Sequence, residues 1–175
     1  MDSKNLTDEL KNISIRGRMA YLLCSFENLL LYYDCDKDEW KPVLEKLWAY
    51  TKMEYLDDWM YEIAEYLPNS ILEDTMEDAE YITEIEIHTL YKLYNKTSQE
   101  IQSFLSIIYE CGTHELYGRL CDNSPDTLKL VEEARNILKT QNINLLDFSD
   151  FKKYTYQECG GWGTCFEGSL LSKFI

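Results

Sequence analysis

The strongest helix signal lies between Ile13 and Tyr33, where the chain reads ISIRGRMAYLLCSFENLLLYY. Apolar residues recur there at steps of three and four, which places them on one face of a helix. They are Met19, Leu22, Leu23, Phe26, Leu29, Leu30 and Tyr33. Because a helix buries its apolar face against neighbouring elements, this segment predicts a helix at the centre of an all-α fold.

Further helices are predicted along the rest of the chain from the same spacing. They start at about residue 38, with Val43, Leu44, Leu47 and Trp48 buried, and then cover 54–67, part of 77–94, 97 to as far as 120, 124–138 and a short stretch in 149–156. Pro42 fits the first of these only within the first turn. Thr97 and Glu100 have the spacing of a capping box, and Ser124 precedes Pro125 as an N-cap precedes a first helical residue.

Two stretches need separate treatment. Residues 82–87 alternate like a strand, but the apolar spacing continues through Leu90, Leu93 and Tyr94, which favours a helix. Near the end of the chain three glycines surround Trp162, a composition that excludes regular helix. We therefore predict one all-α domain over residues 1–175, a bundle of about six to seven helices with an irregular, Gly-rich segment over 158–175.

The composition is that of a globular protein outside the membrane. The chain has 175 residues, of which 45% are hydrophobic, enough for one domain with a substantial core. Met1 to Lys11 is polar and unlike a signal peptide, and the apolar run Leu29 to Tyr33 is too short to span a bilayer. We expect a cytoplasmic protein, and the richness in Tyr, Lys, Asn, Ile and Glu is typical of a bacterial genome rich in A and T.

The charge distribution gives the main functional signal. Between Met53 and Tyr91 the chain has twelve carboxylates and neither Lys nor Arg, within a protein whose formal net charge is −15. Unrelieved charge of one sign repels itself and destabilises the compact state. This stretch, the acidic segment, therefore either meets an electropositive partner or serves solubility.

Helical spacing divides the acidic segment into two stripes. On a helix, Glu54, Asp58, Glu62 and Glu65 share one face, with Leu56, Met60, Ile63 and Leu67 opposite; a second stripe follows as Glu73, Glu77, Glu80 and Glu84. A solvated helix face would look the same. We predict that the segment binds a basic protein surface through Tyr55, Asp58, Trp59, Glu62, Glu65, Glu77, Glu80, Tyr81 and Glu84, with the aromatic residues as anchors.

Catalytic and metal-binding patterns are scarce. His88 and His114 each follow a Glu by four residues, a spacing more typical of surface contacts, and the sequence contains no His-Glu-x-x-His, P-loop or dinucleotide-binding motif. The six cysteines show no zinc-site or disulfide-framework spacing, so we predict reduced, buried or half-buried thiols without metal. We predict no catalytic residues, no cofactor and no enzyme activity.

The basic residues do not form a patch that could bind phosphates. The one short basic cluster, Arg16 to Arg18, lies beside a hydrophobic helix. We expect a local role for it, either pairing with a carboxylate such as Glu27 or lying on the bundle surface. Direct nucleic-acid binding is opposed by the net charge.

The chain resembles the immunity proteins of bacterial polymorphic-toxin and contact-dependent inhibition systems. The resemblance lies in the acidic, compact helical plan, in Ile15-Arg16-Gly17-Arg18-Met19-Ala20-Tyr21 followed by Cys24 and Glu27-Asn28, and in Gly160-Gly161-Trp162-Gly163. It implies stoichiometric binding to a cognate toxin. Two alternatives stay open: an inhibitor that mimics nucleic acid, and a small enzyme built from carboxylates and a histidine. Trp162 either closes the end of the bundle or lies in an interface.

Overall fold

The computed structural model describes residues 9–73 and 79–175. Its α-helices are α2 (Ile15–Tyr32), α3 (Lys37–Ala49), α4 (Leu56–Tyr66), α5 (Pro68–Glu73), α6 (Glu84–Asn95), α7 (Gln99–Thr113) and α8 (Pro125–Thr140). Three 3₁₀ helices follow: η1 (Phe148–Phe151), η2 (Glu158–Gly161) and η3 (Gly168–Leu171). No strand is present in these ranges, so the all-α prediction is confirmed, and the ambiguous stretch 82–87 enters helix α6 at Glu84.

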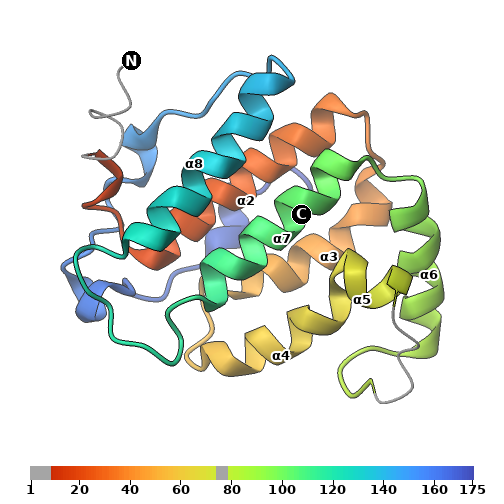
Figure 1. Cartoon of the computed structure of the whole chain (residues 1–175), viewed down its shortest axis with the longest axis horizontal. Coiled ribbons are helices and arrows are strands. Elements are labelled where there is room, and N and C mark those ends of the chain that lie inside the picture. The colour runs from red at the N-terminus through yellow and green to blue at the C-terminus, as the bar shows by residue number, and fades with distance from the viewer. Residues whose placement is uncertain (1–8, 74–78) are drawn as a thin grey trace.

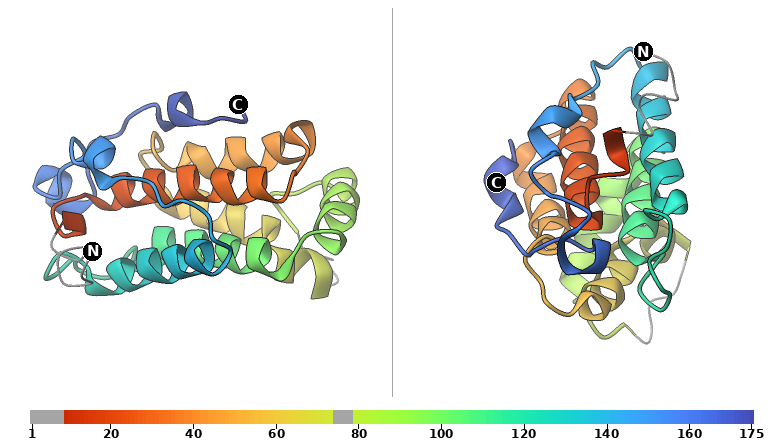
Figure 2. Two further views of the ribbon diagram at one scale, coloured as in Figure 1. Left: turned by 90° about the horizontal axis from the view of Figure 1, so that it is seen from above. Right: turned by 90° about the vertical axis from the view of Figure 1, so that its left-hand side faces the viewer.

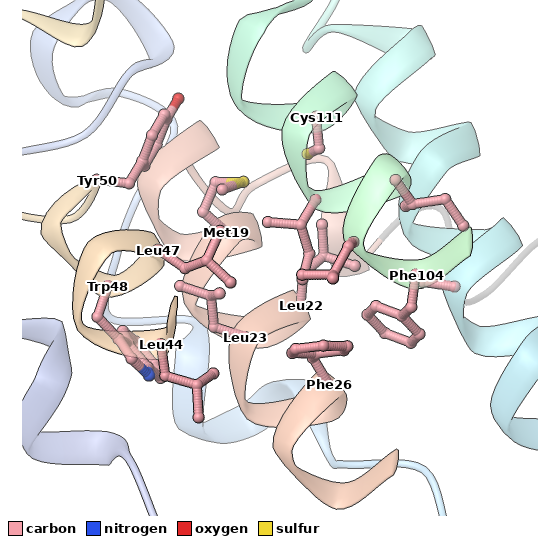
Figure 3. Packing of buried hydrophobic residues seen from close by; sticks show 14 of the residues in the cluster. Met19, Leu22, Leu23, Phe26, Leu44, Leu47, Trp48, Tyr50, Phe104 and Cys111 are labelled. Atoms are coloured by element: carbon pink, nitrogen blue, oxygen red, sulfur yellow. The ribbon is translucent and has the colours of Figure 1, made fainter. Parts of the chain in front are cut away.

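Helix α2 lies at the centre of the bundle, as its sequence predicts. Helices α7 and α8 pack along one side of it, and α3 and the C-terminal segment cover the other (Figures 1 and 2). Fourteen of its eighteen residues are buried, the pattern expected of a helix surrounded by others. Figure 3 shows part of the resulting core, with Phe26 of α2 beside Phe104 of α7. The ring centroid of Phe26 lies 5.5 Å from that of Phe104 and 5.6 Å from that of Trp40.

Helices α4, α5 and α6 form the part of the bundle that carries the acidic segment (Figure 1). α4 packs on α3 and α7, and α5 packs on α4 and α6. No helix was predicted directly after residue 67, but Pro68 starts α5, a position where its missing N–H costs nothing. The helix predicted within 77–94 begins at Glu84. Its N-cap Thr83 and its third residue Glu86 form a capping box.

Three helix ends differ from their sequence predictions. Pro42 is the sixth residue of α3 and exposed, so it lies beyond the first turn. The N-cap of α7 is Ser98 rather than Thr97, whose hydroxyl donates to the Leu93 carbonyl. That helix stops at Thr113, well before residue 120. Ser124 is the N-cap of α8 as predicted, but its hydroxyl donates to Glu115 at 2.6 Å and makes no cap bond.

Three charged side chains of α2 are buried. Arg18 is fully buried and donates to Thr127 Oγ1 at 2.6 Å and to the Leu10 and Ser124 carbonyls at 3.2 Å. Burial lowers the pKa of Arg18 to about 10. Arg16 is also buried, and donates to the carbonyls of Tyr50 and Met53.

The third buried charge of α2, Glu27, holds the C-terminal segment. Its carboxylate accepts from Trp48 Nε1 at 2.8 Å, from Ser172 Oγ at 2.6 Å and from the Lys173 backbone N–H at 2.6 Å. The prediction that an arginine of the basic cluster pairs with Glu27 or lies on the surface is therefore wrong. Carbonyls, hydroxyls, an indole and a backbone N–H bind these charged groups, while the buried Nε atoms of Arg16 and Arg18 have no hydrogen-bond partner.

The cysteines are more exposed than predicted. Cys111 is buried and Cys24 and Cys35 are half-buried, but Cys121, Cys159 and Cys165 are exposed. Among the described residues no group of three or more His, Cys, Asp or Glu side chains is arranged to hold a metal ion. A search of the same residues for a helix long and apolar enough to cross a membrane finds none.

Candidate interaction surface

The acidic segment is presented mainly by α4. Asp57 and Asp58 lie exposed in its first turn, where the helix dipole favours negative charge. The opposite face buries Leu56, Trp59, Ile63 and Tyr66. The sequence predicted Met60 and Leu67 in place of the two aromatic residues, and both are half-buried instead.

The predicted surface position of Trp59 is wrong. Its side chain has 0% exposure, and its indole N–H donates to the Lys46 carbonyl at 3.0 Å. Gly112 of α7 makes room for the ring: a Cβ at this position would lie 2.7 Å from Trp59 Cζ3. Trp59 is therefore a core residue, and the anchors must be sought among other side chains.

Two of the predicted docking acids have partners inside the protein. Glu62 forms an ion pair with Lys46 at 2.5 Å, and the Lys46 ammonium lies 4.6 Å from the centroid of the Tyr66 ring. Glu65 accepts from the backbone N–H groups of Glu80 and Tyr81 at 2.9 and 2.7 Å. Both carboxylates are half-buried, so they hold α4 to its neighbours more than they face a partner.

The second acidic stripe does not form one helix face. Glu73 ends α5, Glu80 and Tyr81 lie in an irregular stretch, and Glu84 is the first residue of α6. Glu77 lies outside the described residues. The hydrogen bonds of Glu65 nevertheless bring Glu80 and Tyr81 to the C-terminal end of α4, while Tyr55 and Asp58 lie at its N-terminal end.

A carboxylate that the site prediction omitted holds the start of α6. Glu86 accepts from the Tyr66 hydroxyl at 2.7 Å and from the Thr83 backbone N–H and hydroxyl at 2.9 and 2.7 Å. Burial acts to raise the pKa of Glu86, but the hydrogen bonds from Thr83 and Tyr66 outweigh it and lower the pKa below its usual range. Burial, together with the hydrogen bond to Glu86, raises the pKa of Tyr66 well above that of a free tyrosine.

Exposed tyrosines accompany the exposed acids. Tyr55 is 67% exposed and Tyr81 45%, as their predicted role requires. The sequence analysis missed Tyr61 and Tyr117, which are 50% and 72% exposed and have hydroxyl oxygens 3.4 Å apart. This hydrogen bond, with smaller effects of burial and of the nearby charge of Asp57, raises the pKa of Tyr117 to about 12.

The two missed tyrosines differ in how far sequence could have found them. Tyr61 lies off the buried positions of α4, so the correct core face would have identified it as exposed. Tyr117 comes from the connection after α7, and no periodicity places it beside α4. We refer to Tyr61 and Tyr117 as the tyrosine pair.

A groove adjoins the start of α4, with a volume of about 720 Å³. It is lined by Arg16, Lys52, Glu54, Leu56, Asp57, Leu116, Cys159, Trp162, Gly163, Thr164 and Cys165. Two of these residues, Arg16 and Leu56, belong to the first turns of α2 and α4, and both helices begin at the same end of the bundle (Figure 1). Trp162 is half-buried, and the backbone carbonyl of this residue accepts from the Arg16 backbone N–H at 3.0 Å. The ring is therefore partly packed and partly available to a ligand.

Both histidines are exposed, the placement that their spacing favoured. His114 Nε2 lies 3.4 Å from Asp126 Oδ2, so its nearest carboxylate belongs to α8 and not to Glu110. His88 is exposed on α6. Both the imidazole of His114 and its carboxylate partner are about half exposed, an arrangement typical of a surface contact.

Comparison with protein-family models, with curated proteins and with solved structures found no match to this chain. The chain is therefore described by its fold and surface alone: it is an all-α bundle whose acidic segment presents carboxylates and tyrosines around α4.

Proposed function

We propose that the protein is an acidic inhibitor that binds a basic partner protein stoichiometrically, in the manner of an immunity protein and its toxin. One observation carries the proposal: exposed tyrosines lie beside carboxylates that have no internal cation. Within the described residues, no Lys, Arg or His nitrogen lies within 4.0 Å of the carboxylates of Glu54, Asp57, Asp58, Glu80 and Glu84.

The two kinds of side chain serve different steps of binding. Complementary charge speeds encounter between partners, and the gain falls as salt rises. Tyrosine contributes a large ring with few rotatable bonds and is enriched among residues that dominate binding energy. Tyr55 supplies such a ring at the start of α4, Tyr61 and Tyr117 supply rings at its middle, and Tyr81 supplies one near its end.

The alternative, an inhibitor that mimics nucleic acid, has less support than this proposal because it would need regularly spaced charges. Glu62 is paired with Lys46, and Glu65 is held by two backbone N–H groups. The charges left free are clustered at the two ends of α4 rather than repeated along it. A protein surface with a few basic residues fits this arrangement better than a site built for evenly spaced phosphates.

The test begins with the gene beside the one that encodes this chain. Its product is expressed in a sensitive host alone and together with the present protein. We expect growth inhibition by the neighbour alone, rescue on co-expression, and a 1:1 complex in native mass spectrometry. Rescue without a complex, or no rescue by a folded protein, would contradict the proposal.

Matched variants then locate the surface. Tyr61→Ala with Tyr117→Ala should speed dissociation of the complex and leave the melting temperature nearly unchanged, because both rings are exposed. Tyr32→Ala is the control, since Tyr32 is also 54% exposed but lies at the far end of α2. Equal losses for both sets would place the interface elsewhere.

A further inference from the structure

We propose that the groove beside α4 receives one arginine side chain of the basic partner. The inference rests on the proposed function for the source of that arginine, and it names the pocket and the chemistry that capture it. The groove volume of about 720 Å³ falls within the range of roughly 300–1,000 Å³ typical of ligand pockets.

The apolar part of the groove suits the arginine stem. Leu56, Leu116 and Trp162 line it, and the two last residues are half-buried, so their apolar surface is partly open. Arginine covers such surface with its methylene groups while its guanidinium stays near water. A guanidinium also stacks on an indole face, the most favourable of the aromatic rings for this contact.

The acidic part of the groove suits the arginine head. Glu54 and Asp57 both line it, both are exposed, and neither has an internal cation within the described residues. Charge-assisted hydrogen bonds from a guanidinium to carboxylates are stronger than neutral ones and fix its orientation. The two carboxylates therefore supply the acceptors that a bound arginine needs.

The two cations of the groove are already engaged. Arg16 is 4% exposed and donates to the carbonyls of Tyr50 and Met53. Lys52 is paired with Glu167 at 3.4 Å. Neither has a bond to Glu54 or Asp57, so the acidic side keeps its charge for a ligand.

The groove is continuous with the rest of the proposed interface. Asp57 lines the groove and lies four positions before Tyr61 on α4, so the two side chains share one face of the helix. The tyrosine pair therefore borders the same carboxylate that the arginine would contact. Together these residues form one surface of mixed aromatic and acidic character at the start of α4.

The test uses a small probe and no partner protein. N-acetyl-L-arginine amide is titrated into the full chain, and the indole N–H of Trp162 is followed by NMR. We expect a saturable shift at Trp162 and at the Thr164 and Cys165 amides. N-acetyl-L-citrulline amide has nearly the same shape without the charge. Its affinity should be lower by about tenfold or by a larger factor, because charge-assisted hydrogen bonds are lost.

Paired variants assign the carboxylates. Glu54→Gln with Asp57→Asn should weaken arginine-amide binding about tenfold, and Glu80→Gln with Glu84→Gln, which removes the same charge at a distance, should leave it within about twofold. Equal binding of the citrulline probe, equal loss in both double variants, or shifts that spare Trp162 would overturn the proposal. The two proposals can fail separately, because this titration contains no partner protein. If the arginine amide does not bind, the co-expression experiment still tests the proposed function; if co-expression gives no rescue, binding of the arginine amide can still be measured.

Discussion

At the scale of single residues, a close approach of α4 and α7 explains why Trp59, predicted as a surface anchor, is buried. Trp59 is buried because Gly112, which lies 53 positions later, has no side chain to exclude it. Gly112→Ala should destabilise the protein by about 1–3 kcal/mol through overpacking, although alanine is the better helix former. Urea unfolding measures the change. Gly118→Ala, whose nearest neighbour atom would lie 3.7 Å away, is the control and should be nearly neutral.

Glu27 allows a second prediction at this scale. Glu27→Gln retains the shape but replaces one acceptor oxygen by an NH₂ group, which leaves a buried donor without its acceptor. We expect a loss of about 1–3 kcal/mol in the free energy of unfolding. Glu45→Gln changes an exposed carboxylate with a long surface ion pair of 3.9 Å, and should change stability by less than about 0.5 kcal/mol. Similar values for both variants would contradict the role of Glu27.

At the scale of elements, the capping box of α6 should make its stability depend on pH. The folded state lowers the pKa of Glu86, so its contribution is present above the unfolded value of about 4.3 and is lost as pH falls through the lower folded value. The difference in melting temperature between the wild type and Glu86→Gln should therefore be present at pH 7 and shrink toward pH 3. A difference that stays constant over this range would show that the charge of Glu86 is not involved.

The same helices show how far sequence patterns reach. The apolar spacing located α2, α3, α4, α6, α7 and α8, and the glycines around Trp162 excluded regular helix there. It placed Leu56 and Ile63 of α4 correctly in the core but missed Trp59, whose burial depends on Gly112 of another helix. It also missed the tyrosine pair and the groove, since both join segments far apart in the chain.

At the scale of the whole molecule, the net charge of −15 should make stability depend on salt. Like charges repel in the compact state, and this repulsion is screened over about 10 Å at 0.1 M salt. The melting temperature should therefore rise between roughly 10 mM and 300 mM NaCl. Glu80→Gln with Glu84→Gln should fold normally and show a smaller rise. A melting temperature that falls with salt would mean that favourable ion pairs dominate.

The buried carboxylate on α2 also sets an order of events during synthesis. Two of its three hydrogen-bond donors belong to Ser172 and Lys173, which lie 145 and 146 positions later in the chain. While the ribosome is still making the protein, α2 is complete before Ser172 and Lys173 have been added. The Glu27 carboxylate then lacks two of its three hydrogen-bond donors. Bringing a buried charge into an apolar core without partners is costly. A chain that stops before residue 172 would bury Glu27 without these two donors. The complete fold is therefore expected only after translation has passed residue 172.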